Sequence, residues 1–434
     1  MEPGLVAAFY GVETAIEGAV GAAFAIAKST VPLKGSFTRI PSTPLPRSSH
    51  SLSVIKGRAY IFGGEERPRE PVDNAVHVVT IPGSTVEEAD YRLVPAQPSS
   101  DGGDVPSPRV GHTAAVVDDR IYIFGGRGGK EMQPLQEHGR VFVFDTKLNH
   151  WSHLDPPPGS PYPEGRSYHA STGNEHPLPH KEDHTERPIG LPDLDDHGTI
   201  FVHGGCTAQG RQADVWAFDI ASRTWSRFPD APGEARGGPC LTVTQGRLYR
   251  FGGFDGKSEL GQQIDYLKLS RSTFYDKGGH GEFEVLPKGK WESVPFPTDK
   301  KGPGNRSVAG LQPITTGQGR NFLLLFLGET EPSSGGHESA GKFSSDVWTF
   351  MLHPDGLTAA SIKDATRQAV GAETGEGSWA EVEIPEATMK KGRKEHPGKR
   401  GWFASDVGDG KVILWGGVNE ENERLGDGWI LTVE

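Results

Sequence analysis

Six arginines recur along the chain, and each stands shortly before a run of residues typical of a β-strand. They are Arg47, Arg109, Arg166, Arg236, Arg306 and Arg400. A guanidinium group can hold a carboxylate or a similar oxyanion through two parallel hydrogen bonds. We predict a pocket in which Arg47 and Arg109 polarise a polar or anionic substrate, while Arg166, Arg236, Arg306 and Arg400 bind it. The alternative is that each arginine serves the fold by bridging to the next repeat.

Two acidic and two aromatic residues complete the predicted pocket. Glu65 or Glu329 would act as the general base, while the arginines stabilise negative charge that develops on oxygen. Phe254 and Trp402 would line the pocket as substrate-binding residues. The sequence contains no nucleophile elbow, Walker loop or His-Glu-x-x-His motif. We therefore predict lyase, isomerase or cyclase chemistry on a small molecule of specialised metabolism, without a cofactor.

Histidines raise the question of a metal site. His50, His112 and His169 each stand three residues after one of the arginines, and three such histidines could bind a metal ion. We favour the simpler interpretation, in which each ring is packed and hydrogen-bonded within its blade, and predict no metal. A second group of histidines and acidic residues, in residues 175–197, is predicted to be a solvated loop. Cys206 is predicted to be a spectator.

A repeated strand pattern must position these residues. A β-branched or aromatic run ending in two glycines recurs, and the pairs are Gly63-Gly64, Gly125-Gly126, Gly204-Gly205, Gly252-Gly253 and Gly416-Gly417. In a decayed copy, Leu324–Glu329, Glu329 is predicted to replace the second glycine. Each run is followed by another strand-like run and then by an aromatic residue. The aromatics are Tyr91, Trp151, Trp225, Trp291 and Trp379, and Phe37 near the start supplies the sixth.

This pattern resembles kelch repeats over residues 36–434. The resemblance implies an all-β, six-bladed β-propeller in which the N-terminal strand around Phe37 completes the last blade. Residues 1–35 are predicted to be an N-terminal extension with a short amphipathic helix. The double glycines would let neighbouring blades approach closely.

Among kelch proteins, the plant specifier proteins are similar in style. They are free-standing propellers with stretches similar to residues 46–50 and 60–65 of this chain. The resemblance implies an arginine-lined mouth, and ferrous iron held by a Glu-x-x-x-Asp-x-x-x-His motif. That complete motif does not occur in this sequence. Many kelch domains instead bind proteins, so the alternative function is an interaction scaffold that captures an acidic peptide or a partner protein.

Composition restricts the choice of function further. The 434 residues include 59 glycines and 34 prolines, yet 34% of the residues are hydrophobic, which favours many short strands over a helical fold or disorder. The formal net charge of −12 disfavours a nucleic-acid partner. No uninterrupted apolar run is long enough for a transmembrane helix. Two cysteines exclude a disulfide framework, and we predict a cytoplasmic protein.

Overall fold

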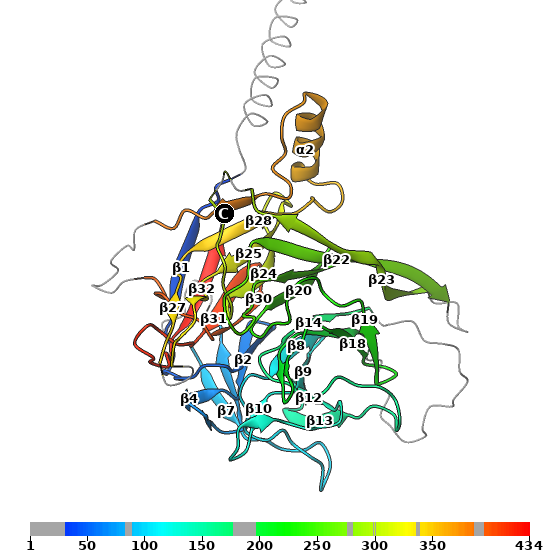
Figure 1. The fold of residues 1–434 in the computed structure, drawn as a ribbon, viewed down its shortest axis with the longest axis vertical. Coiled ribbons are helices and arrows are strands. Elements are labelled where there is room, and N and C mark those ends of the chain that lie inside the picture. The colour runs from blue at the N-terminus through cyan, green and yellow to red at the C-terminus, as the bar shows by residue number, and fades with distance from the viewer. Residues whose placement is uncertain are drawn as a thin grey trace, which may run out of the picture.

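Short strands rich in β-branched and aromatic residues build the structure. The computed structural model describes residues 31–82, 89–176, 197–275, 281–297, 299, 301–335, 339–385 and 395–434. Within these residues, six antiparallel sheets of four strands stand around a common centre in chain order (Figure 1). The predicted all-β, six-bladed propeller is therefore confirmed.

Five blades run in chain order from an inner strand to an outer one. Blade 1 contains β2 (Ser51–Ile55), β3 (Arg58–Phe62), β6 (Val76–Thr80) and β7 (Tyr91–Val94). Blade 2 contains β8 (Thr113–Val117), β9 (Arg120–Phe124), β12 (Val141–Asp145) and β13 (His150–Leu154). Blade 3 contains β14 (Ala170–Asn174), β15 (Thr199–His203), β18 (Val215–Asp219) and β19 (Thr224–Phe228). Blade 4 contains β20 (Cys240–Thr244), β21 (Arg247–Phe251), β22 (Gln263–Tyr275) and β23 (Gly281–Pro295). Blade 5 contains β24 (Gly310–Thr315), β25 (Asn321–Phe326), β28 (Val347–Met351) and β29 (Trp379–Glu381).

Blade 6 joins the two ends of the described chain. Its inner strands are β30 (Ala404–Gly408), β31 (Lys411–Trp415) and β32 (Gly428–Val433), and β1 (Gly35–Ile40) is its outer strand. Strand β1 pairs antiparallel with β32, with Phe37 opposite Leu431, and Figure 1 shows the blue strand beside the red ones. The inner strands β2, β8, β14, β20, β24 and β30 contact one another in a closed circle. The predicted closure by an N-terminal strand is thus confirmed.

The paired glycines allow close contact between neighbouring blades, as predicted. Gly63 has a φ of 63°, and a Cβ at this position would lie 2.7 Å from the carbonyl oxygen of Arg109 in blade 2. Any side chain would therefore meet both backbone strain and a steric clash. The blades can pack this tightly only because no Cβ is present.

The aromatic residues of the outer strands pack across the boundary between blades. Trp151 of β13 lies with its ring centroid 5.1 Å from that of Phe62 in blade 1. Trp225 of β19 stands 4.9 Å from Phe124 in blade 2 by the same measure. Both indoles are almost completely buried. Burial of such large apolar rings against the preceding blade supplies much of the adhesion between repeats.

The loop after β28 contains helix α2 (Ala359–Ala369), which starts with a capping box between Thr358 and Ser361. The buried Asp364 of this helix pairs with Arg320, and this contact attaches the helix to blade 5. The predicted N-terminal helix and most of the histidine-rich segment lie outside the described residues. Among the described helices, none has the length and apolar character needed to cross a membrane.

Candidate functional site

One residue from every blade takes part in a closed ring of backbone hydrogen bonds. The six are Ser49, Gly111, Tyr168, Gly238, Val308 and Trp402, each two positions after one of the arginines. Each donates its N–H to the carbonyl oxygen of the preceding member, and Ser49 closes the ring by donating to Trp402, with N···O distances of 2.7–3.3 Å. All six have φ values of 44–61°, which non-glycine residues adopt only where the surroundings impose it. The ring therefore fixes the backbone around the propeller's centre.

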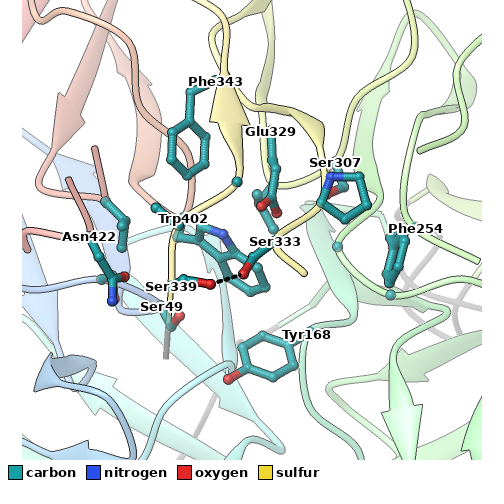
Figure 2. Close-up of a pocket in the computed structure, with 18 of the residues that line it drawn as sticks. Ser49, Tyr168, Phe254, Ser307, Glu329, Ser333, Ser339, Phe343, Trp402 and Asn422 are labelled. Carbon is teal, nitrogen blue, oxygen red and sulfur yellow. Dashed lines mark hydrogen bonds between the residues drawn. The ribbon is translucent and has the colours of Figure 1, made fainter. Parts of the chain in front are cut away.

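A cavity of about 330 Å³ opens beside this ring. All six blades contribute to its wall, through the segments before their inner strands and through the loops between the second and third strands. Figure 2 shows Glu329, Trp402 and Tyr168 converging on this space, with Phe254 and Phe343 at its sides. The volume lies at the lower end of the range of small-molecule sites.

Short hairpins shape the cavity wall. They are β4 (Glu65–Arg67) with β5 (Glu70–Pro71), β10 (Arg127–Gly128) with β11 (Gln133–Pro134), β16 (Cys206–Thr207) with β17 (Gly210–Arg211), and β26 (Glu329–Glu331) with β27 (Lys342–Phe343). In each blade, the residue that directly follows the glycine pair, or follows Leu327-Gly328 in blade 5, starts such a hairpin or forms an equivalent isolated β-bridge. These residues are Glu65, Arg127, Cys206, Phe254, Glu329 and Val418, and all of them line the cavity.

The alignment of blade 5 with the other blades corrects one prediction. Leu327 and Gly328, with φ values of 56° and 98°, occupy the places that Gly63 and Gly64 hold in blade 1. Leucine therefore replaces the first glycine, and Glu329 does not replace the second. Glu329 is the counterpart of Glu65.

The six arginines lie inside the blades and do not line the cavity, contrary to the expected convergence at the mouth. Each guanidinium donates to the carbonyl oxygen of the first residue of the glycine pair or its equivalent, at 2.9–3.1 Å. All six side chains are buried: Arg47, Arg109, Arg166, Arg236, Arg306 and Arg400. A buried guanidinium needs fixed acceptors, and the blade itself supplies them.

Four of these arginines also form two-pronged ion pairs with an acidic residue of the same blade. The pairs are Arg109–Glu137, Arg166–Asp214, Arg306–Asp346 and Arg400–Asp427. Arg47 instead contacts the ring nitrogen of His77 at 3.2 Å, and burial lowers the pKa of Arg236 to about 10. This geometry indicates a role in the fold, but the contacts stay within one blade, whereas the structural alternative placed them across to the next repeat. Their catalytic and substrate-binding roles stay untested predictions.

The three histidines pack between blades. The His112 ring shares a hydrogen bond of 3.0 Å with the Ser51 hydroxyl, and His169 shares one of 2.7 Å with Thr113. His112 also stands edge-on to Phe62. Each of these partners belongs to the preceding blade, whereas contacts within one blade were expected. Burial lowers the pKa of His112 to about 3, so its ring is neutral. The described residues contain no cluster of three or more His, Cys, Asp or Glu side chains suited to a metal ion.

Glu329 is a buried carboxyl group on the cavity wall. The indole N–H of Trp402 and the backbone N–H groups of Ser333 and Gly341 hydrogen-bond to it. A Cβ at Gly341 would collide with its Oε1 atom, so the glycine makes room for the carboxyl group. Burial outweighs the hydrogen bonds and raises the pKa of Glu329 to about 7. This carboxyl group can therefore take up and release a proton near neutral pH.

The other charged side chains of the wall differ in their pairing. Glu65 accepts a hydrogen bond of 2.9 Å from Arg424, and both side chains are buried. The guanidinium of Arg127 lies 4.9 Å from the centre of the Tyr168 ring, and that of Arg211 lies 4.9 Å from the Phe254 ring. Among the residues that the structure describes, neither Arg127 nor Arg211 has a carboxylate within ion-pair distance. These two cations are available to a ligand.

Four of the predicted site residues meet in the cavity: Glu65, Glu329, Phe254 and Trp402. The prediction gave no role to Tyr168, Arg424, Arg127 or Arg211. Tyr168 occupies the same place after its arginine as Trp402 does, so the repeat register could have identified it. No pattern in the sequence indicates that Arg424 pairs with Glu65.

The iron implied by the resemblance to specifier proteins does not fit these residues. Glu423 and Asp427 have the spacing of the first two ligands, but the third position is Leu431, which is buried in β32. Asp427 is engaged by Arg400 and by the indole of Trp429. A metal-binding role for this trio would need a donor atom that leucine lacks.

Comparison with known proteins agrees with the blade pattern. A model described as KLHDC2/KLHL20/DRC7 Kelch-repeats domain matches residues 34–178, and a Kelch motif model matches residues 196–232. The chain belongs to the kelch-repeat family. A solved chain titled "Structure of YjhT" superposes on this kelch propeller with a TM-score of 0.56 and 15% sequence identity. That superposition covers 91% of this chain and 99% of the other, and it shows the fold alone.

Two kinds of kelch relative are similar in sequence. Over 410 residues the chain is 27% identical to the N-(sulfonatooxy)prop-2-enimidothioate sulfolyase of Thlaspi arvense, covering 90% of this chain and 93% of that enzyme. Over 273 residues it is 26% identical to Kelch domain-containing protein 3 of Bos taurus, covering 60% of this chain and 62% of that protein. The first alignment spans nearly the whole propeller, and the second spans less than two thirds of the relative.

Proposed function

We propose that this kelch propeller is an enzyme that binds a small organic anion in its central cavity and moves a proton on it, in a lyase, isomerase or cyclase reaction. Glu329 acts as the general base, since its carboxyl group exchanges a proton near neutral pH. Arg127 and Arg211 hold the anionic group of the substrate. The observation that carries the proposal is the presence in one cavity of Glu329 and of two guanidinium groups that have no carboxylate partner among the described residues.

The cavity wall supports this assignment of roles. The aromatic rings of Tyr168 and Phe254 hold the two guanidinium groups in place, which reduces the entropy lost when a ligand binds. The indole of Trp402 and the ring of Phe343 add apolar surface for the body of the ligand. Glu65 is less suited to be the base, because Arg424 already neutralises it.

The relative from Thlaspi arvense lends support by its name. A sulfolyase of an N-(sulfonatooxy) compound acts on a small molecule that carries a sulfate ester, which is an anion. A substrate of this class would place its anionic group on Arg127 and Arg211.

Calorimetric titration of the full chain with phenyl sulfate tests the anion site. We expect binding that falls at least about tenfold in an R127Q/R211Q variant, because two charge-assisted contacts are lost. The control is R227Q, which removes an exposed guanidinium that pairs with Asp230. Phenol is the uncharged control ligand. Equal binding by the wild type and R127Q/R211Q would refute the anion site.

Native mass spectrometry of the protein purified from its own source separates the enzyme from the scaffold alternative. A retained small organic anion, released on denaturation, would support the enzyme. A stoichiometric protein partner, displaced when the cavity wall is altered by F254A, would favour an interaction scaffold for an acidic peptide. The scaffold alternative is included because relatives such as Kelch domain-containing protein 3 have names that state no enzymatic activity.

A further inference from the structure

A second buried carboxyl group lies directly behind the cavity wall. Glu259 belongs to the loop between β21 and β22 and forms an isolated β-bridge with Phe254. Its side chain is 4% exposed, and within the described part of the chain neither carboxylate oxygen has a hydrogen-bond partner of normal geometry. A buried, unpaired carboxylate costs several kcal/mol, so the group takes its neutral, protonated form. No arginine or lysine of the described residues forms an ion pair with it.

Ser307 stands between this group and Glu329. Ser307 and Glu329 are paired by two backbone hydrogen bonds, each of 2.9 Å. Residues paired in this way point their side chains to the same side of the sheet. The Ser307 hydroxyl is also the polar neighbour of the Glu259 carboxyl group, which in turn senses the charge of Glu329. Figure 2 shows Ser307 beside Glu329 on the cavity wall.

We propose that Glu259 and Glu329 form a proton-sharing carboxyl pair connected by the Ser307 hydroxyl, with Glu259 as a positioning residue that keeps Glu329 ionised and ready to act as a base. The pair holds one proton and one negative charge, because two adjacent buried carboxylates cannot both be ionised at modest cost. In the exchange, Glu259 donates its proton to the Ser307 oxygen while the Ser307 hydroxyl donates its own to Glu329. One O–H bond breaks at Glu259 and one forms at Glu329, so charge and atoms balance.

The other charged groups nearby do not disturb this assignment. Asp255, in the same loop as Glu259, adds to the negative potential and favours the protonated form of Glu259. Burial is the main cause that raises the pKa of Glu259, to about 8, above the value of about 7 for Glu329. Trp402, Ser333 and Gly341 hydrogen-bond to Glu329, whereas among the described residues neither carboxyl oxygen of Glu259 has a hydrogen-bond partner of normal geometry, so Glu259 is the member that holds the proton. This role rests on the proposed function of Glu329, but the pairing itself can be measured without a substrate.

Infrared difference spectroscopy between pH 5 and pH 9 tests the pair, because a protonated carboxyl group has its own C=O stretching band. We expect E259Q to lose one protonated-carboxyl band that wild type shows at pH 7. E329Q should keep that band and lower its titration midpoint by about one pH unit or more, since a neighbouring negative charge is removed. S307A should shift the band's frequency, because the polar hydroxyl beside the acid is lost.

E331Q is the matched control, since Glu331 lies in the same strand as Glu329 but is exposed. The buried Asp406, whose pKa burial raises to about 6, contributes equally to all variants and cancels in the comparison. An E259Q spectrum identical to wild type, or an unchanged midpoint in E329Q, would overturn the pair. If E259Q does not fold, the E329Q midpoint decides alone. Loss of phenyl sulfate binding in R127Q/R211Q with an intact carboxyl pair would leave both proposals standing. The same loss of binding without coupling between Glu259 and Glu329 would refute the pair only.

Discussion

Arg424 of blade 6 donates a hydrogen bond of 2.9 Å to Glu65 of blade 1, across the boundary where the two ends of the chain close the ring. The two residues are 359 positions apart in sequence. Glu329 holds the equivalent place in blade 5, where, among the described residues, no basic side chain pairs with it. Two glutamates in the same repeat position therefore differ in their surroundings, because among the described residues Glu65 has an arginine partner and Glu329 has none.

The Glu65–Arg424 pair should contribute measurably to the stability of the ring. We expect R424M to lower the free energy of unfolding by about 3 kcal/mol, because it leaves a buried carboxylate unpaired. The double variant E65Q/R424M should lose less than the sum of the two single variants. Urea unfolding of wild type, E65Q, R424M and E65Q/R424M gives the four free energies of this double-mutant cycle. Strictly additive losses would show that the two side chains do not interact.

The carboxyl group of Glu329 should make stability depend on pH. Its folded-state pKa of about 7 lies above the ordinary value of 4.5, so the folded protein binds this proton more tightly than the unfolded chain does. This contribution is complete below pH 4.5 and is lost as the pH rises through 7. Between pH 4 and pH 8 the wild type should lose roughly 3 kcal/mol relative to E329Q. Denaturant unfolding curves of wild type and E329Q at both pH values check this prediction. If the difference in free energy of unfolding between the two proteins is the same at both pH values, the raised pKa of Glu329 is contradicted.

The close contact between blades at Gly63 can be separated from backbone strain. Gly57 has a φ of 71° with open space around it, while Gly63 has a φ of 63° and faces the Arg109 carbonyl. We expect G57A to cost about 1 kcal/mol through backbone strain alone and G63A to cost clearly more. Thermal unfolding of both variants measures the difference. Equal losses would mean that the blades have room for a side chain.

Arg166 provides the test of whether the buried arginines serve the fold or the ligand. Its guanidinium group holds Asp214 through two contacts of 2.6 and 3.0 Å. We expect R166M to lower the free energy of unfolding by about 3 kcal/mol, because Asp214 loses its partner. Binding of phenyl sulfate to the folded fraction should stay within about twofold of wild type. A large loss of phenyl sulfate binding without loss of stability would show that Arg166 contributes to ligand binding and not to the fold.

Much of the fold could be predicted from local pattern. The glycine pairs, the aromatic of each outer strand and the strand around Phe37 indicate six blades and their closure, because each repeat satisfies its own backbone hydrogen bonds and needs only its neighbours for burial. The repeat also explains why part of the predicted set of site residues lies in one cavity. Glu65, Glu329 and Phe254 start equivalent loops on one face of the propeller, so the repeat alone places them together.

The sequence by itself determined the propeller, the face on which a cavity forms and the residue types that line it, because these follow from short-range periodicity and from the φ angles that glycine allows. Only the tertiary structure decided which charges are free to act. The six repeated arginines donate hydrogen bonds to carbonyl groups, and in four cases to carboxylates, of their own blades. Arg424, which lies far along the chain from Glu65, forms an ion pair with that residue. Glu329, Arg127 and Arg211 stay available, since pairing of charges depends on distances between blades that no local pattern encodes.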